Sequence, residues 1–543
     1  MPLLVWEKTK KDWFYMMKDV ILKKKDARKE RSDEPKEAFL KNEVLAAYYN
    51  YEPPHNTKYH LHIGPTNAGK THAAFARLKE ANTGVYLAPL RLLALEVYEL
   101  LNAEGIPCNL QTGEEERIVT EAFHLSCTVE MLQTNREYDV IVVDEAQMIT
   151  DRDRGFAWYR AIMKSRAREV HVVASIDAKP LLLHLLVEQE VIIHEYERLT
   201  PLKIEEKRFS MKKVEIGDAL IVFSKNRVLQ SAAQLKMLHK SVSVIYGSMP
   251  PEARQQQVER FQRGETTVLV ATDAIGMGLN LPIQRIVFLE SEKFDGKMRR
   301  LLTGQEVKQI AGRAGRKGMY DVGKVLFCQR RRQMKKLLRT SDIPHERFTI
   351  SPTRELLERF TRYSCDMGQF FRLWKEFEAP VGTQKVTLIQ EKQLYGLIKG
   401  SEIEQRMSLP DLYEVLHLPF AAHERGLVKQ WRATLYAIVR KEEWPEPMQK
   451  TSSLDEMELS YKSMGLHVIF LYRSNQRTLA QIWERERTIM AERIDEYLRK
   501  HLIKHRKKCK SCQTHMPWDY PHNMCQRCYE KQLLSYDYEE DYW

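Results

Sequence analysis

The eight residues GPTNAGKT at 64–71 constrain the fold of this chain more than any other feature. They match the pattern G-x-x-x-x-G-K-[ST], and they stand between an apolar run, YHLHI, and a helix-forming segment, HAAFARLKE. A loop of this kind, between a strand and a helix, binds phosphate through backbone N–H groups at the positive end of the helix dipole. We therefore predict an α/β domain with a phosphate-binding loop after its first strand. An accidental glycine-rich turn is the competing interpretation, and the flanking strand and helix both disfavour it.

The residue types of this loop predict a nucleotide site. Glycine lets the backbone approach the phosphates closely. The lysine of such a loop reaches the β- and γ-phosphates, and the following threonine offers its hydroxyl to Mg²⁺. We expect ATP as the nucleotide, held by Gly64, Pro65, Thr66, Asn67, Ala68, Gly69, Lys70 and Thr71.

A pair of acidic residues follows the apolar run DVIVV. Asp144 and Glu145 would stand at the carboxyl end of a parallel strand, where α/β sheets bind their ligands. We predict that Asp144 holds Mg²⁺ together with Thr71 and that Glu145 is the general base for the attacking water. A solvated or helix-capping pair is the alternative, and the position after a phosphate loop favours the catalytic interpretation.

Short apolar runs alternate with helical stretches up to about residue 345, which is typical of parallel α/β sheets. The segment ERLTPL at 197–202 interrupts this alternation and separates two α/β units. Beyond residue 345 apolar residues recur at helical spacing, for example Leu479, Ile482, Trp483, Met490 and Ile494, and we interpret them as core. The predicted segments are a charged helical extension (1–50), a first α/β domain (51–200), a second (201–345), a helical domain (346–505) and a small C-terminal module with an acidic tail (506–543).

The second α/β unit carries two candidate site segments. QIAGRAGR at 309–316 places Arg313 and Arg316 three residues apart, which would put them on one face if the segment is helical. A nucleotide held by the first domain needs added positive charge at its γ-phosphate, and these arginines can supply it, with Gln309 sensing the phosphate or the water. VATDAIGMGLNLP at 270–282 offers Gly276 for close contact with nucleotide and Thr272 for a nucleic-acid phosphate. Taken alone, both segments could be ordinary surface loops.

Four of the eight cysteines cluster near the C-terminus. Cys509, Cys512, Cys525 and Cys528 form C-x₂-C-x₁₂-C-x₂-C, which can offer four thiolates to a tetrahedral Zn²⁺. Two disulfides are the rival interpretation, and an intracellular compartment disfavours them. The adjacent basic run KHRKKCK suggests a nucleic-acid contact. The module could equally be a folding staple or a docking point for a protein.

The charge balance favours a polyanionic partner. Lys and Arg number 86 against 74 acidic residues, a net charge of +12, and cations that neutralise phosphates release counterions. A solvated basic surface is the alternative. No apolar run approaches the ~18–20 residues that cross a bilayer, so we expect no membrane association. The N-terminus mixes acids with bases, unlike a signal or transit peptide, and we expect a bacterial cytoplasmic protein.

Several segments in this order resemble a known family. GPTNAGKT, VVDEAQ, VATDAIGMGLNLP and QIAGRAGR are similar to motifs I, II, V and VI of superfamily 2 helicases. GVYLAPLRLLALEVYELLNAEGIPCNLQTGEEER, ERLTPL, IVFSKNR and VIYGSMPPEARQQQVERF resemble the suppressor-of-var family of DExH-type RNA helicases. The resemblance covers roughly residues 58–330. Gln147 stands where the wider DExH group has His, and VVASIDAKP at 172–180 matches motif III poorly.

The resemblance implies two tandem RecA-like domains and ATP-dependent unwinding of RNA with 3′ to 5′ translocation, in RNA turnover beside a ribonuclease partner. It also implies that Arg313 and Arg316 are arginine fingers and that Pro89 and Arg91, in APLR, contact the nucleic-acid strand. Some members of the family act on DNA as well as RNA, so the resemblance also allows single-stranded DNA as a partner. Two alternatives stay open: a DNA helicase or translocase with the same ATP-hydrolysing domains, and a non-catalytic ATP-gated RNA clamp or scaffold.

Overall fold

The computed structural model describes residues 57–276, 281–296, 298–316, 318–380, 382–501, 507–509, 511–512, 514–516 and 524–530. It divides the chain into two compact units. The first contains residues up to Glu197 together with Ile343–Met490, and the second contains Arg198–Asp342 together with the residues from Ala491 onward. The predicted N-terminal extension (1–50) and the acidic tail lie outside the described residues.

The first unit is built on an eight-stranded sheet with the order β4-β3-β5-β2-β6-β7-β1-β8. All neighbouring strands are parallel except β3 and β4. Its strands are β1 (Lys58–Ile63), β2 (Gly84–Ala88), β3 (Cys108–Gln111), β4 (Glu116–Arg117), β5 (His124–Thr128), β6 (Glu137–Val143), β7 (Arg166–Ala174) and β8 (Glu190–Glu195).

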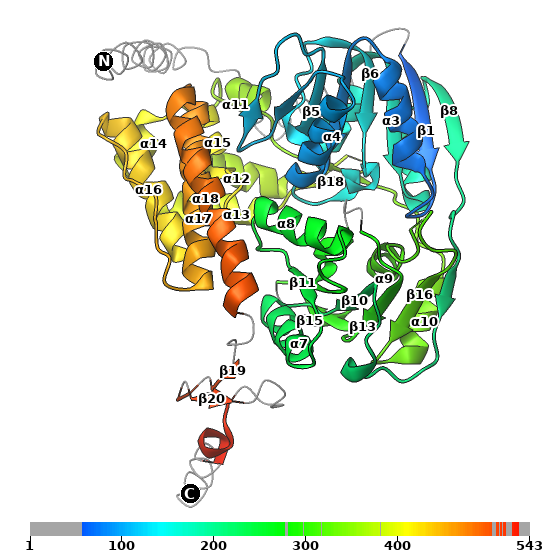
Figure 1. Cartoon of the computed structure of the whole chain (residues 1–543). Coiled ribbons are helices and arrows are strands. Elements are labelled where there is room, and N and C mark those ends of the chain that lie inside the picture. Colours follow the sequence, from blue (N-terminus) through cyan, green and yellow to red (C-terminus); the bar gives the residue numbers. More distant parts are fainter. Residues whose placement is uncertain are drawn as a thin grey trace, which may run out of the picture. The chain divides into compact units, whose positions relative to one another are not determined.

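Helices cover both faces of this sheet, which explains why its central strands are apolar throughout. Alternate residues of β2 enter different cores: Val85 and Leu87 pack on one face, and Tyr86 and Ala88 pack on the other. The second of these faces is covered by α3 (Lys70–Glu80) and α4 (Arg91–Ala103), as Figure 1 shows. The first face is covered by α5 (Gly155–Met163) and α6 (Lys179–Leu185).

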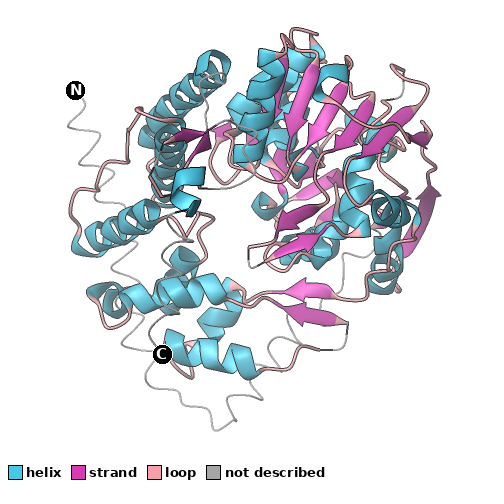
Figure 2. Ribbon diagram, turned by 90° about the horizontal axis from the view of Figure 1, so that it is seen from below, coloured by secondary structure: helices cyan, strands magenta, loops and turns pink. Residues whose placement is uncertain are grey.

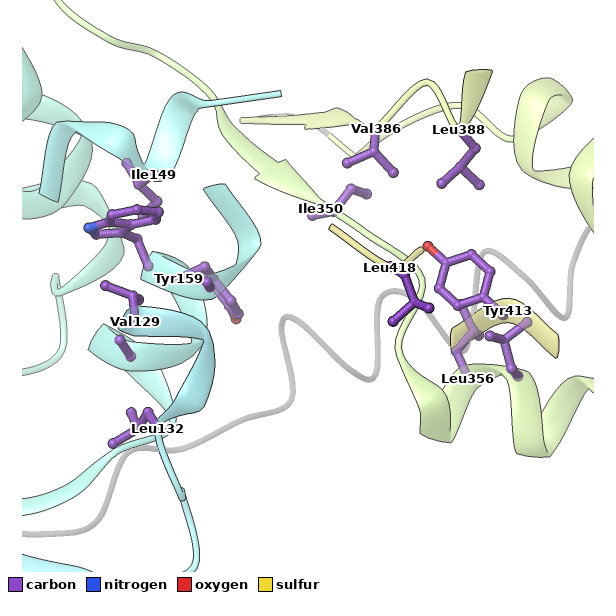
Figure 3. Packing of buried hydrophobic residues seen from close by; sticks show 14 of the residues in the cluster. Val129, Leu132, Ile149, Tyr159, Ile350, Leu356, Val386, Leu388, Tyr413 and Leu418 are labelled. Carbon is purple, nitrogen blue, oxygen red and sulfur yellow. The ribbon is translucent and has the colours of Figure 1, made fainter. Parts of the chain in front are cut away.

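The helical region after residue 343 shares a core with the α5 face of the sheet. The rings of Tyr159 and Phe348 stack with centroids 4.8 Å apart, and Gln384 donates to the carbonyl of Thr150. Figure 3 shows apolar side chains of both regions in this cluster, with Ile149 on one side and Ile350 on the other. The helical domain is thus an extension of the first α/β domain.

This region is mostly helical, with one small parallel sheet of β17 (Phe348–Ile350) and β18 (Thr383–Lys385). Its helices are α11 (Arg354–Phe360), α12 (Met367–Glu376), α13 (Ile389–Ile398), α14 (Glu402–Arg406), α15 (Leu409–Leu416), α16 (Arg425–Arg440), α17 (Leu454–Arg473) and α18 (Arg477–His501). On α18 the predicted core positions Met490 and Ile494 are buried. Leu479 and Ile482 are exposed instead, because Ala480 is the residue that faces the core there.

The second unit has a six-stranded parallel sheet with the order β11-β12-β10-β13-β16-β9. Figure 2, coloured by secondary structure, shows helices beside the strands. The strands are β9 (Leu202–Ile204), β10 (Asp218–Ile221), β11 (Val242–Ile245), β12 (Val268–Ala271), β13 (Arg285–Phe288) and β16 (Gly323–Phe327), and a hairpin is formed by β14 (Glu292–Phe294) and β15 (Arg299–Leu301). The helices are α7 (Lys225–Met237), α8 (Pro251–Gln262), α9 (Gly304–Ala311) and α10 (Arg331–Arg339). The expected pair of parallel-sheet domains is confirmed.

Near the C-terminus the described residues form a short hairpin of β19 (Lys507–Lys508) and β20 (His515–Met516). Within the described part of the chain, no helix combines the length and apolarity needed to cross a bilayer.

Candidate nucleotide and nucleic-acid site

The phosphate loop begins where β1 ends, at the carboxyl edge of the first sheet. Gly64 is packed so tightly that a Cβ there would lie 2.5 Å from the backbone oxygen of Tyr196. Gly69 precedes α3 with φ 85°, a left-handed conformation that glycine adopts without strain. Both predicted glycines are therefore required by the backbone path, and the loop ends at the N-terminus of α3, where backbone donors face outward.

Lys70 is folded back into this loop. Its Nζ donates to the carbonyl oxygens of Gly64 at 2.7 Å and Pro65 at 2.6 Å. These contacts hold the ammonium over the loop, so that a bound phosphate would gain a cation already positioned beside the backbone donors.

Asp144 and Thr71 meet at the same edge of the sheet. The Thr71 hydroxyl donates to Oδ1 of Asp144 at 3.3 Å, and the Tyr86 hydroxyl donates to Oδ2 at 2.6 Å. The indole of Trp158 fixes the backbone by donating to the Asp144 carbonyl at 2.9 Å. Burial, and then the charge of Glu145, raise the pKa of Asp144 to about 6. A cation beside this carboxylate would stabilise its charged form.

A magnesium ion fits this donor set. A hydroxyl and a carboxylate are hard oxygen ligands, and Mg²⁺ is usually held by one or two such protein groups together with phosphates and waters. Thr71 and Asp144 would hold it here. The ion would neutralise phosphate charge when bound.

Glu145 has a left-handed backbone, with φ 50° and ψ 46°, which is uncommon for a residue with a side chain. Strain of this kind persists where surrounding contacts hold it, often at functional sites. Here the side chain of Gln147 provides such contacts: its Nε2 donates to Glu145, and its Oε1 accepts from the backbone N–H of Ser175 at 3.2 Å.

The side chain of Gln147 thus links Glu145 to Ser175, which belongs to the segment VVASIDAKP. This segment therefore contacts the site, although its sequence matches motif III poorly. Ser175 follows β7 and touches Gln147, and Asp177 pairs with His345 at 2.9 Å. Burial alone would raise the pKa of Asp177, but hydrogen bonds from His345 and Ser175 hold it below its usual value. Sequence reasoning missed Tyr86, Trp158 and Ser175. Gln147 was noticed only as a departure from the DExH pattern.

In the second unit, the two predicted segments lie against each other. Arg313 donates from Nε and Nη2 to the carbonyl of Gly276, at 3.1 and 2.6 Å. A Cβ on Gly276 would lie 3.5 Å from the Gln309 side chain. Thr272 is buried, and its hydroxyl caps the short turn after β12 by accepting from the N–H of Ala274. Arg316 is half-buried at the end of the same loop.

The linker residue Arg198 orders this arginine segment. Its guanidinium donates to the carbonyls of Thr200 at 2.6 Å, Gly312 at 3.0 Å and Ala314 at 2.5 Å. Burial lowers its pKa to about 10. Gly315 has φ 76°, and a Cβ there would lie 2.7 Å from Gly323. The sequence marked ERLTPL only as a linker, because two of the three carbonyl partners of Arg198, those of Gly312 and Ala314, lie more than a hundred residues away and leave no local signal.

The predicted strand-contacting residues occupy a polar junction of the first unit. Arg154 donates to the Pro89 carbonyl at 2.7 Å. Arg91 begins α4, and its guanidinium pairs with Glu114 at 3.1 Å and Glu115 at 2.7 Å. The same guanidinium donates to the Tyr461 hydroxyl of α17 at 3.3 Å. In this arrangement the charge of Arg91 is committed to carboxylates of its own domain.

The four clustered cysteines converge. Their sulfur atoms all lie within 4.8 Å of one another, and Cys512 and Cys525 are 3.6 Å apart. A tetrahedron with Zn–S bonds of about 2.3 Å has edges of about 3.8 Å, whereas disulfide sulfurs lie about 2 Å apart. N–H groups of Cys512 and Cys525 lower the pKa of the Cys509 thiol to about 6. The geometry is compatible with zinc. Among the cysteines outside this cluster, Cys365 is exposed.

Two family models match the chain. One, the DEXQ-box helicase domain of Suv3, matches residues 46–196, and the other, the helicase conserved C-terminal domain, matches residues 203–318. The two α/β domains are similar to the domains of Suv3-type helicases. Gln147 is thus the last residue of a DEXQ box, which explains its departure from the DExH pattern.

Curated relatives of this Suv3-like core are ATP-dependent RNA helicases by name. The rice protein SUV3L, mitochondrial, is 42% identical over 279 residues, covering 50% of this chain and 38% of the relative. The rice protein SUV3, mitochondrial, is 42% identical over 311 residues, covering 56% and 54%. The Saccharomyces cerevisiae protein SUV3, mitochondrial, is 44% identical over 266 residues, covering 47% of this chain and 36% of the relative. The chain therefore spans about half the length of these relatives, or less.

The expected bacterial cytoplasmic location is wrong by this comparison, because these relatives are all named as mitochondrial helicases. The expectation rested on mixed charges near the N-terminus. Such a mixture does not define a compartment, since targeting is a property of a separate segment and not of the helicase core.

Proposed function

We propose that this chain is an ATP-dependent RNA helicase. The observation that carries the proposal is the convergence of Lys70, Thr71 and Asp144 at the end of the first sheet, in a domain of the Suv3 type. The RNA substrate is supported by the names of the curated relatives.

In the proposed cycle, Lys70 and the loop N–H groups bind the β- and γ-phosphates of ATP, and Thr71 and Asp144 hold Mg²⁺. Glu145 orients the attacking water and accepts its proton, and Gln147 keeps that carboxylate in place. Because Gln147 also bonds the backbone of Ser175, a change at the γ-phosphate alters the segment after β7. In the same segment, Asp177 pairs with His345. These contacts support the proposal that hydrolysis is coupled to translocation along the nucleic-acid strand.

The second α/β domain supplies the cationic half of the active site in this proposal. Arg313 and Arg316 act as arginine fingers, and Gln309 senses the γ-phosphate. On nucleotide binding, Arg313 exchanges its hydrogen bonds with the Gly276 carbonyl for hydrogen bonds with phosphate oxygens. The loop after Thr272, which contains Gly276, then loses its contact with Arg313. Thr272, Pro89 and Arg91 lie on segments that bind the nucleic-acid strand.

The four cysteines hold one structural Zn²⁺, and the adjacent basic run, which lies largely outside the described residues, contacts nucleic acid. We also propose 3′ to 5′ polarity and a ribonuclease partner in RNA turnover.

Strand displacement by the full chain tests the proposal. Duplexes with matched 3′ or 5′ overhangs of RNA or DNA are incubated with ATP and Mg²⁺, and with Lys70→Ala as the inactive control. We expect displacement of RNA duplexes with a 3′ overhang. Displacement confined to DNA would favour the DNA motor, and ATP hydrolysis without any displacement would contradict the helicase assignment.

A further inference from the structure

Four histidines gather on one face of the first sheet, beyond the nucleotide site. His60 and His62 are two residues apart on β1, so they project from the same face. His171 of the parallel strand β7 is the register partner of His60, and His194 of β8 is the partner of His62. The rings stack, with centroids 4.5 Å apart for His60 and His171 and 4.8 Å for His62 and His194. Apolar packing does not require four imidazoles in one place.

We propose that His60, Glu169 and His171 form a binding site for one divalent transition-metal ion of the zinc class. One ligand atom from each lies within 4.8 Å of the other two. Two imidazoles and one carboxylate are a donor set suited to Zn²⁺ and Co²⁺, and three protein ligands leave a fourth position for water.

Distances between the donors fit a bound ion. His171 Nε2 and Glu169 Oε2 are 3.2 Å apart. Ligand bonds of about 2.1 Å at a near-tetrahedral angle give an N···O separation of about 3.4 Å, so this pair needs little movement. The ring of His60 is stacked parallel to that of His171, so it must turn to direct its nitrogen lone pair at the ion. His60 contacts His194 through Nδ1 and therefore offers Nε2 to the ion.

Hydrogen bonds behind these ligands support metal binding. The Tyr196 hydroxyl lies 2.7 Å from His62 Nδ1, and His62 Nε2 lies 2.9 Å from His171 Nδ1. Without metal, Tyr196 donates to His62, His62 donates to His171, and His171 donates from Nε2 to Glu169, which can only accept. When an ion replaces the Nε2 proton, each donor in the chain can become the acceptor, so that every imidazole nitrogen keeps a partner. Metal-bound histidines usually have such partners.

Arg77 sets the strength of the site. Its Nε and Nη2 donate to the two oxygens of Glu169, each at 2.9 Å. The contact orients the carboxylate, and one lone pair of Oε2 becomes free when the ion takes the place of the His171 Nε2 proton. The arginine charge also repels a cation, so this site binds metal more weakly than the four cysteines do.

Cobalt titration of the full chain tests the proposal. In a Cys509→Ser, Cys512→Ser background, Co²⁺ should give visible d–d absorption without the thiolate charge-transfer band, saturate at one ion per chain and raise the thermal midpoint. His171→Gln and Glu169→Gln should each lower the affinity at least tenfold. His184→Gln, which changes an exposed histidine of the same domain, should leave it unaltered.

Arg77→Gln protects the test against misfolding, because it should tighten Co²⁺ binding severalfold by removing the repelling charge. Gained affinity cannot arise from lost structure. The proposal is overturned if the background protein binds no Co²⁺, if His171→Gln binds it as tightly as the background, or if Arg77→Gln weakens binding.

Discussion

Arg487 of α18 donates from Nη2 to Oε2 of Glu114, a residue 373 positions earlier in the chain. The guanidinium also lies 4.2 Å from the centroid of the Tyr461 ring, and the same oxygen of Glu114 accepts a second hydrogen bond from Arg91. The start of α4 and the helical region are therefore joined by an alternating series of charges. Both arginines are largely shielded from water, at 16% and 5% side-chain exposure.

Replacing Arg487 should loosen this junction. We expect Arg487→Met to destabilise the first unit by about 3 kcal/mol, the low end for breaking a buried pair, because Arg91 still neutralises Glu114. Denaturant unfolding with a probe in the first unit measures this. The exposed arginine of the same helix gives the control Arg485→Met, which should change stability little. Equal stability of both variants and wild type would show that the junction is not structural.

Glu484 should make stability depend on pH. Burial raises its pKa to about 7, although Tyr472 donates to it. The unfolded chain loses this proton near pH 4.5 and the folded chain only near 7, so the group's unfavourable effect on stability develops as pH rises between these values. Glu484→Gln should therefore match wild type near pH 4. At pH 8 it should be more stable by on the order of 1 kcal/mol, discounted for partial exposure. A difference that is largest at pH 4 would contradict this assignment.

The sequence predicted the parts of the fold that depend on local patterns. The strand–loop–helix context of residues 64–71 and the acids after DVIVV were sufficient to find Lys70 and Asp144. The shared core of Tyr159 and Phe348 could not be predicted, because the sequence around each residue does not indicate which distant residue it packs against. In the sequence, Arg487 is one of several charged residues in a helical segment. Only the folded structure shows that it contacts Glu114.

Arg313→Ala should slow ATP turnover by about 10³-fold, as expected for loss of an arginine finger. ATP affinity should change far less, because Lys70 and the loop N–H groups remain. Single-turnover hydrolysis and nucleotide titration separate the two effects. Arg332→Ala, an exposed arginine of the same unit, serves as the control. Turnover within a few-fold of wild type would remove Arg313 from the active site.

Cys509→Ser with Cys512→Ser should release about one equivalent of zinc per chain, because two thiolates of the tetrahedron are lost. Basal ATPase activity should survive, since the α/β domains have their own cores, and RNA affinity should fall. Cys365→Ser, at an exposed thiol outside the cluster, should keep the zinc. Elemental analysis decides the matter. A wild-type protein without zinc under reducing conditions would contradict the metal site, and loss of basal ATPase with the metal would contradict its independence.

The most direct test of the account is steady-state ATP hydrolysis by the full chain, with and without single-stranded RNA, combined with nucleotide binding. We expect RNA to stimulate hydrolysis by wild type. Lys70→Ala should lose hydrolysis together with most nucleotide affinity, and Glu145→Gln should keep the affinity and lose turnover, since its carboxylate acts on water and not on phosphate. Two results would contradict the assignment of this site as the ATPase site of an RNA helicase. One is a wild-type hydrolysis rate that does not change when RNA is added, and the other is RNA-stimulated hydrolysis by Lys70→Ala at the wild-type rate.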